Sequence, residues 1–406
     1  MIKPWYGGRR IAFVPVSNSQ VDSTLPPGFQ DQVWRRAFYD PEPATGIDRS
    51  LQQYIRTVSS GYAHIDGEVL RPVVANGPDT MGAAINALPP NHSFQVAVAV
   101  LPHAFGQHRG GWAWWDMSEQ NGITDWCRIA LYQDPIFSMR QNVGVWAMEV
   151  LHSTTHVGDL YNVSPAPGRY DVMACSCGTH PSTNTKSTMG WLHAGAIRQH
   201  PIGTSATYTL HALSLPQPPP PGRLTAVSIK SLDSPGQFVI EARLRTDAYE
   251  TPGTLSQGIP AEGVNVYEVQ GVTQVFLRRS GMSAGSSFSD ATEGLTVRVT
   301  GQVDGGFRVS VTSRATKRCS ELFRQIEALR ESIEHETDIN IRKQLISALA
   351  RAMSEYRELN CVVRPRVESD VDLSPIFAPP SGDNTLGVSG KPPRPRATKG
   401  KRTAKR

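Results

Sequence analysis

The sequence predicts an α/β domain, a β-rich domain, a helical hairpin and a basic tail, in this order. Three observations lead to this prediction. Strand-like and helix-like segments alternate in the first half of the chain, apolar residues recur with a period of two over Leu224–Thr312, and two apolar stripes with helical spacing lie within Cys319–Cys361. Such changes of period separate structural classes along a chain. The expected domains are residues 1–200, 201–316, 317–363 and 364–406.

Strands and helices are predicted in alternation in the first domain. The short apolar run Ile11–Val14 and the β-branched run Phe94–Leu101 favour buried strands, and Arg128–Gln133 is a third strand candidate. Apolar residues at helical spacing predict helices over Gly46–Val58 and Asn142–His156. This alternation is typical of an α/β layer domain.

A β-rich, sandwich-like domain is predicted next. Pro216–Gly222 contains five prolines, which indicates a stiff connector or a long loop. After this segment, the sequence contains runs of alternating apolar residues that have the length of β-strands. Turn residues lie between these runs, as in an all-β domain. The expected strands are Leu224–Ile229, Phe238–Leu244, Val264–Val269, Thr273–Leu277, Leu295–Thr300 and Phe307–Thr312.

The segment Cys319–Cys361 has the pattern of an antiparallel helical hairpin. Thr337 or Asp338 is placed to cap its second helix. A hairpin brings its ends together, so a disulfide between Cys319 and Cys361 is geometrically reasonable, and two unpaired thiols are the equal alternative. The apolar stripes are Leu322, Ile326, Leu329 and Ile333 in the first helix, and Leu345, Leu349, Ala352, Tyr356 and Leu359 in the second.

Composition and charge exclude several classes of protein. Apolar residues make up 39% of the 406 residues and charged residues 19%, which excludes wholesale disorder, and no window approaches the eighteen apolar residues of a spanning helix. The formal net charge is +5, but Lys391–Arg406 holds eight basic residues and no acidic one, so the rest of the chain carries −3. The basic character therefore belongs to the tail and not to the folded body.

The two ends of the chain bear on partners and location. The tail, residues 391–406, has no aromatic residue, so it favours either a nonspecific polyanion contact with nucleic acid or anionic lipid, or a solvated segment that transport or processing machinery reads. The apolar run Ile11–Val16 is too short for a signal peptide. This predicts a cytoplasmic protein, unless it is exported by a non-classical route.

One predicted helix carries candidate catalytic residues. Met148, His152 and His156 recur every four residues and are expected on one helix face, with Glu149 beside them. In the H-E-x-x-H signature, two His one turn apart bind Zn²⁺ and the Glu removes a proton from the metal-bound water. Here Glu149 and the second His, His152, are present, and Met148 stands at the first ligand position.

The flanking residues extend this likeness over roughly residues 10–312. The matching segments are Gly144–Ala147, Asp159–Tyr161, Tyr170–Met173, His180–Ser182, Lys186, Met189–Leu192, Ser50–Gly61, Phe238–Arg243 and Gly263–Tyr267. In this ordered series the chain resembles the immune inhibitor A-type secreted metallopeptidases of bacteria. The resemblance implies a zincin-like fold with Met173 in a methionine turn, a zinc site with His152 and Asp159 as ligands, Glu149 as base, and a peptide or protein substrate.

Three departures from the family pattern bear on function. The thioether of Met148 is a poor Zn²⁺ donor. Asp159 lies seven residues after His152, where the family has six. Two cysteines, Cys175 and Cys177, follow the methionine turn and could replace the lost ligand.

Three interpretations of the site follow. In the first, His152 and Asp159 still hold a metal with help from His156, Cys175 or Cys177, and Glu149 acts as base in peptide-bond hydrolysis. In the second, the site is dead and the domain is a pseudopeptidase that binds a peptide or protein partner. In the third, the Met, His and Cys set selects a softer metal such as Cu(I), or serves redox chemistry.

Structural roles compete with these interpretations. Met148 can be a core methionine, His156 a polar helix residue, and Cys175 or Cys177 a buried thiol or a disulfide partner of Cys127. The aromatic cluster Trp112, Trp114 and Trp115 can form an apolar subsite or can close the core under a loop. His103 and His108 are further candidate ligands.

Overall fold

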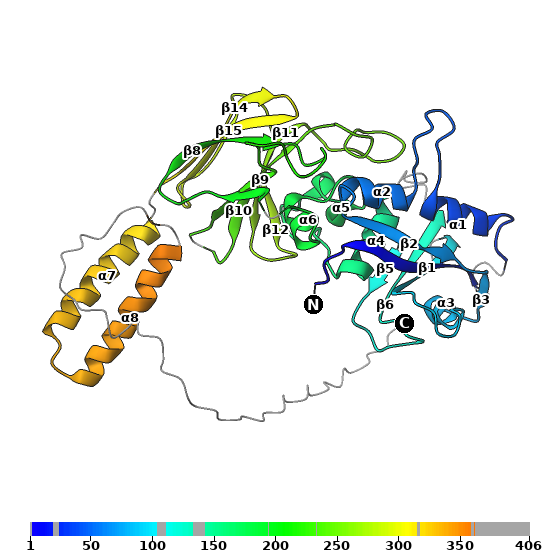
Figure 1. Ribbon diagram of the computed structural model, residues 1–406, viewed down its shortest axis with the longest axis horizontal. Coiled ribbons are helices and arrows are strands. Elements are labelled where there is room, and N and C mark those ends of the chain that lie inside the picture. The colour runs from blue at the N-terminus through cyan, green and yellow to red at the C-terminus, as the bar shows by residue number, and fades with distance from the viewer. Residues whose placement is uncertain are drawn as a thin grey trace, which may run out of the picture. The chain divides into compact units, whose positions relative to one another are not determined.

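The computed structural model describes residues 2–18, 24–103, 111–132, 143–193, 195–232, 234–314, 317–358 and 361. Within these ranges the chain is a mixed α/β protein with three β-sheets and a C-terminal pair of helices (Figure 1). All of them belong to one compact unit, Met1–Arg364. The predicted basic tail and its polyanion contact lie outside the described residues.

The first sheet has the strand order β2-β1-β4-β6-β5, and β3 pairs with the end of β1. Every neighbouring pair is parallel except β5 and β6, so the β5 edge is antiparallel. The strand predicted at Ile11–Val14 is confirmed within β1. Those predicted at Phe94–Leu101 and Arg128–Gln133 are confirmed from Val96 in β4 and up to Tyr132 in β6, and Gln133 lies outside the described residues. The strands are β1 Gly7–Asn18, β2 Ala63–Val69, β3 Val73–Ala75, β4 Val96–His103, β5 Gly111–Trp114 and β6 Asp125–Tyr132.

Alternating side chains of this sheet build two cores. On β1, Ile11 and Phe13 join the core that also contains residues of three helices: α1 (Phe29–Phe38), α2 (Leu51–Val58) and α4 (Gly144–Thr155). Ala12 and Val14 point to the opposite face, where α3 (Thr80–Asn86) covers them. The predicted helix over Gly46–Val58 begins only at Leu51, because the Ser50 side chain caps it by accepting from the Gln53 N–H.

The β-rich region forms two sheets that share a core. The second sheet has the order β12-β11-β10-β9-β7 and the third β13-β14-β15-β8. Val227, Ile240 and Val266 of the former pack in one cluster with Val297 and Val309 of the latter. The strands are β7 Ile197–Gln199, β8 Ser205–His211, β9 Ala226–Lys230, β10 Gln237–Arg243, β11 Gly263–Val269, β12 Val275–Met282, β13 Ser287–Asp290, β14 Leu295–Val303 and β15 Gly306–Ser313.

The Pro-rich segment does not separate two domains. It follows β8, which pairs with β15, and precedes β9, so it connects the third sheet to the second. Val239 and Tyr267 of the second sheet belong to the same core as Met173 and Trp146 of the first region. The α/β and β-rich regions are therefore held together by one continuous core.

A buried ion network reinforces this junction. Arg243 on β10 is fully buried and donates to Glu250 Oε1 (2.6 Å), to Glu241 Oε1 (3.1 Å) and to the carbonyl oxygen of Tyr170 (2.6 Å). Buried charges are tolerated when they are paired and hydrogen-bonded in this way. Tyr170 ends the short 3₁₀ helix η2 (Gly168–Tyr170), so the network ties the segment that leads into the candidate site to the second sheet.

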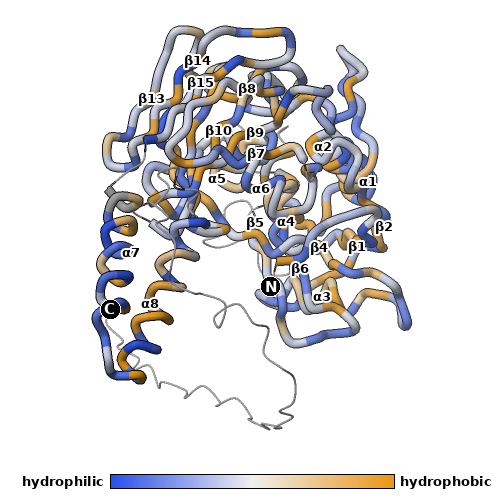
Figure 2. Tube along the Cα trace, turned by 60° about the vertical axis from the view of Figure 1, so that its left-hand side comes forward, coloured by the Kyte–Doolittle hydropathy of each residue, from blue (hydrophilic) through white to orange (hydrophobic). Residues whose placement is uncertain are grey.

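The predicted helical hairpin is confirmed as α7 (Lys317–His335) and α8 (Ile339–Glu358). Asp338 caps α8, as expected, by accepting from the Asn340 N–H at 2.7 Å. Apolar and polar residues alternate along both helices (Figure 2), and the described residues of the apolar stripes pack together with Ile202. Leu359 of the second stripe lies outside the described residues. A disulfide joins Cys319 to Cys361. No helix among the described residues has the length and apolar character that crossing a membrane requires.

Candidate functional site

Helix α4 carries the candidate residues and lies almost wholly inside the protein. Its residues pack on β5 and β6, and every one except Val145 is buried. The helix ends at Thr155, because His156 adopts a left-handed backbone (φ 61°) and its N–H donates to the His152 carbonyl oxygen at 2.9 Å. The expectation that Met148, His152 and His156 share one helix face is therefore wrong for His156, which turns the chain away.

The turn at His156 brings Asp159 back to α4. His152 Nε2 lies 2.9 Å from Asp159 Oδ1, and the Tyr161 hydroxyl donates to Asp159 Oδ2 at 2.8 Å. His152 Nδ1 donates to the Val157 carbonyl oxygen. The two residues predicted as metal ligands thus contact each other across the left-handed turn at His156.

His152 and Asp159 form an ion pair. Burial lowers the pKa of His152, but the hydrogen bond that its ring donates to Asp159 and the charges of Glu149 and Asp159 raise the pKa above its ordinary value overall. Burial raises the pKa of Asp159, but the hydrogen bond from His152 and the charge of His152 outweigh this effect and lower the pKa below its ordinary value. Asp159 therefore stays ionised. Both imidazole nitrogens of His152 face oxygen acceptors, which is the arrangement of a protonated imidazole.

Glu149 is buried beside this pair, with 8% of its surface exposed. Burial raises its pKa to about 7, His152 opposes the rise and Asp159 adds to it. Gly111 on β5 leaves room for the side chain, since a Cβ at position 111 would lie 2.3 Å from Glu149 Cγ. The site therefore holds a carboxyl group that titrates near neutral pH.

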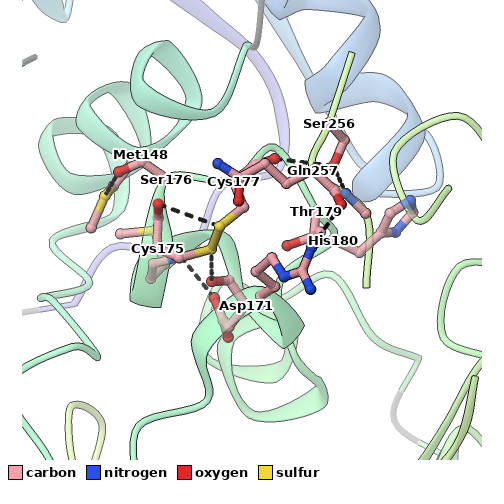
Figure 3. Close-up of a disulfide and its surroundings, with 12 residues drawn as sticks. Met148, Asp171, Cys175, Ser176, Cys177, Thr179, His180, Ser256 and Gln257 are labelled. Atoms are coloured by element: carbon pink, nitrogen blue, oxygen red, sulfur yellow. Dashed lines mark hydrogen bonds between the residues drawn. A yellow bond between two sulfur atoms is a disulfide. The ribbon is translucent and has the colours of Figure 1, made fainter. Parts of the chain in front are cut away.

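A hydroxyl group contacts the thioether of Met148. Met148 is 3% exposed, and Ser176 Oγ donates to its Sδ at 2.7 Å (Figure 3). Ser176 follows α5 (Val172–Cys175), whose Met173 is fully buried in the same core. Met173 also accepts from the Leu160 N–H at 2.9 Å, which holds the Asp159 loop against α5.

The two cysteines predicted as possible ligands are bonded to each other. A disulfide joins Cys175 to Cys177, and Cys127 is a free, buried thiol. This corrects both the ligand hypothesis and the pairing with Cys127, because only a thiolate binds a metal and a disulfide sulfur is not one. In Figure 3 the disulfide and the Met148 side chain lie on two sides of Ser176.

A second polar cluster forms around His156. Its Nδ1 lies 3.3 Å from Asp116 Oδ2 and its Nε2 lies 3.1 Å from Asp125 Oδ1. The Lys3 ammonium group lies 2.8 Å from Asp125 Oδ2 and 3.7 Å from Asp116 Oδ1. The sequence analysis missed Lys3, Asp116 and Asp125, because no spacing links segments so far apart along the chain.

Trp115 connects the two clusters. Its ring stacks on the imidazole of His152 at 5.9 Å between ring centroids and on that of His156 at 6.0 Å. Trp112 and Trp114, on β5, pack against each other in a tilted arrangement with 5.7 Å between ring centroids, and Trp112 is 41% exposed. The aromatic cluster therefore divides: Trp115 packs on the histidines, and Trp112 faces solvent.

Two further histidines are candidate ligands in the sequence. His103 is the last residue of β4, and His108 lies outside the described residues.

The donors at α4 do not fit a catalytic zinc centre. Such a centre takes three protein ligands of imidazole, thiolate or carboxylate type. Across the described parts of the chain, the one group of three such donors that lie within 4.8 Å of one another is Asp116, Asp125 and His156. That group has suitable ligand types, but the Lys3 ammonium group already neutralises Asp125. Neither a family model nor a curated protein matches the chain.

Proposed function

We propose that the protein is a metallopeptidase-like pseudoenzyme whose altered site no longer assembles a zinc centre, and that it acts as a protein- or peptide-binding module. The proposal includes a zincin-like first region and a sandwich-like β-rich region. The observation that carries it is the contact between Ser176 Oγ and Met148 Sδ. A thioether that accepts from a hydroxyl cannot replace an imidazole as a zinc ligand.

The pairing of the other donors supports the same proposal. His152 and Asp159 contact each other at 2.9 Å, and the shifts in their pKa values favour the charged form of each. To bind a cation, His152 would have to give up a proton that this ion pair stabilises. Cys175 and Cys177 offer no thiolate while they are bonded together.

Exposed apolar side chains next to these residues support a binding role. Three of these side chains are exposed: Trp112 on β5, Met117 and Tyr161. Met117 is the residue after Asp116 in the sequence, and the Tyr161 hydroxyl donates to Asp159. Large aromatic and methionine side chains supply much of the affinity at peptide-binding surfaces. A peptide or an extended protein segment with apolar side chains is the partner that this surface suits.

Metal analysis of the purified full chain tests the proposal. We expect that the wild-type chain holds no stoichiometric zinc that depends on His152, so His152→Ala should leave the metal content unchanged. We also expect no cleavage of fluorogenic peptides that depends on Glu149, so Glu149→Ala should leave the background rate unchanged. Because the Asp116, Asp125 and His156 group could bind adventitious metal, His156→Ala is the matched control. Metal that disappears in His156→Ala and persists in His152→Ala belongs to that group.

A gain-of-function variant and a binding assay complete the test. Met148→His restores the first imidazole, so we expect it to raise zinc affinity at α4. Fluorescence anisotropy with a labelled degenerate peptide library should detect binding to the wild-type chain that Trp112→Ala weakens. Stoichiometric zinc on His152, together with cleavage that requires Glu149, would refute the pseudoenzyme proposal.

Peptide-bond hydrolysis is the second candidate function, and one observation favours it. The pKa of Glu149 is raised to about 7, which suits a general base at neutral pH. The same cleavage assay decides between the two functions, because hydrolysis requires the Glu149 carboxylate and binding alone leaves the peptide intact.

A further inference from the structure

The disulfide next to Met148 links residues only two positions apart. Cys175 ends α5, Ser176 caps it in a left-handed conformation (φ 54°), and Cys177 follows. Cys177 is 2% exposed, whereas Cys175 is partly exposed. Figure 3 shows this loop between α4 and the Ser256–Gln257 segment. Cys175 is therefore the more exposed residue of the pair.

Hydrogen bonds hold this loop without help from the disulfide. The Ser176 N–H donates to the Val172 carbonyl oxygen at 2.9 Å. The Cys177 carbonyl oxygen accepts from the Gln257 N–H and from Ser256 Oγ, both at 3.0 Å. The backbone on both sides of the sulfur–sulfur bond is thus fixed independently, and opening the bond leaves these contacts in place.

Each sulfur also lies near an acceptor that only a thiol can use. The Asp171 carbonyl oxygen lies 3.7 Å from Cys175 Sγ, and the Cys175 carbonyl oxygen lies 3.4 Å from Cys177 Sγ. A disulfide has no S–H group to donate, whereas two thiols would donate one S–H each. The reduced pair therefore has hydrogen-bond partners already in position.

The second disulfide of the chain differs in the constraint it provides. Cys319 and Cys361 are 42 residues apart and close the helical hairpin, so their bond removes much conformational freedom from the unfolded chain. A bond between residues two apart removes far less. A bond that adds little to folding resists reduction less, because reducing it forfeits little stability.

We propose that Cys175–Cys177 is an exchangeable disulfide that accepts two electrons from a dithiol, either a small molecule or a protein. A thiolate of the dithiol attacks Sγ of Cys175, the more exposed residue of the pair, and Cys177 leaves and takes up a proton. The second thiol of the dithiol then attacks its own sulfur in the mixed disulfide and releases Cys175, which is also protonated. The partner ends as a disulfide and the pair as two thiols.

The exchange is coupled by contact to α4. Ser176 lies between the two cysteines and donates to Met148 Sδ. Gly144, the first residue of α4, packs against the same loop so closely that a Cβ there would lie 1.9 Å from the Ser176 carbonyl oxygen. The exchanging pair therefore lies in direct contact with the helix that carries Glu149 and His152.

A reductant titration of the oxidised full chain tests the proposal. The chain is incubated anaerobically with increasing dithiothreitol, alkylated with iodoacetamide, digested and mapped by mass spectrometry. We expect Cys175 and Cys177 to be alkylated at a dithiothreitol concentration about tenfold below that needed for Cys319 and Cys361, with the thermal transition unchanged. Simultaneous reduction of both disulfides, or later reduction of Cys175–Cys177, would overturn the proposal.

An exchange assay with cysteine variants identifies the reacting sulfur. A synthetic peptide with two cysteines serves as the protein-type dithiol. We expect the wild-type chain and the double variant Cys319→Ser/Cys361→Ser to oxidise it, and Cys175→Ser to leave it reduced. Cys177→Ser should form a mixed disulfide with oxidised glutathione at Cys175. Oxidation of the peptide by Cys175→Ser at the wild-type rate would also overturn the proposal.

Discussion

Glu149→Gln tests whether the buried carboxyl group on α4 destabilises the folded protein. Burial raises its pKa from the usual value of 4.5 to about 7. One pKa unit corresponds to about 1.4 kcal/mol of free energy. Ionising Glu149 in the folded protein therefore costs about 3 kcal/mol more than ionising it in the unfolded chain. Glutamine keeps the shape of the side chain and removes this penalty.

The penalty depends on pH in a defined window. Below pH 4.5 the carboxyl group is protonated in both the folded and the unfolded state, so it changes stability little. Between pH 4.5 and about 7 only the unfolded chain releases the proton, so the free energy of unfolding falls as the pH rises. Above about pH 7 both states are ionised and the full penalty remains.

Urea unfolding of the wild type and Glu149→Gln from pH 4 to pH 9, with chelator present, measures this difference. We expect the variant to gain stability relative to the wild type as the pH rises through the window, and to reach a plateau of about 3 kcal/mol. Glu119→Gln, at an exposed position, is the matched control and should show no such gain. A Glu149→Gln difference that stays constant across the pH range would refute the reasoning.

Three further predictions concern other parts of the structure. Arg243→Ala leaves two buried carboxylates without their cation and should lower the free energy of unfolding by about 3 to 5 kcal/mol, as measured by urea denaturation. Asp159→Asn should lower the pKa of His152, followed by NMR titration of the imidazole, because it removes the charge that favours the protonated ring. Cys319→Ser/Cys361→Ser should lower stability by up to about 4 kcal/mol in calorimetry, given the 42-residue separation.

Features with a local periodic pattern could be predicted from the sequence. The strand at Ile11–Val14 and the hairpin within Cys319–Cys361 follow from spacing alone, and the structure contains both. The pairing of β8 with β15 and of β7 with β9 could not be predicted, because it joins strands distant in sequence. The role of Pro216–Gly222 could not be predicted either, because its composition indicates a connector or a loop but not the strands that it joins.

The candidate site shows the same division. The resemblance implied that His152 and Asp159 are ligands of one metal, and in the structure the two side chains contact each other. The left-handed turn at His156 was missed, because a histidine carries no signal for a helix end as glycine does. The pairing of Cys175 with Cys177 depends on loop geometry, and the contacts of His156 with Asp116 and Asp125 depend on the packing of β5 and β6 against α4.

The penalty at Glu149 also separates the two candidate functions. A carboxyl group with a pKa of about 7 is half ionised near neutral pH. In a hydrolase the ionised form is the base, so the cleavage rate should rise as the pH passes 7. In a binding module the ionised form attracts a cationic group of the bound peptide. The affinity for a lysine-bearing peptide should therefore rise over the same pH range, while the affinity for a neutral analogue of that peptide stays constant. In Glu149→Gln the pH dependence of the cleavage rate and that of the peptide affinity should both vanish. If the protein is a hydrolase, this variant should also form no cleavage product.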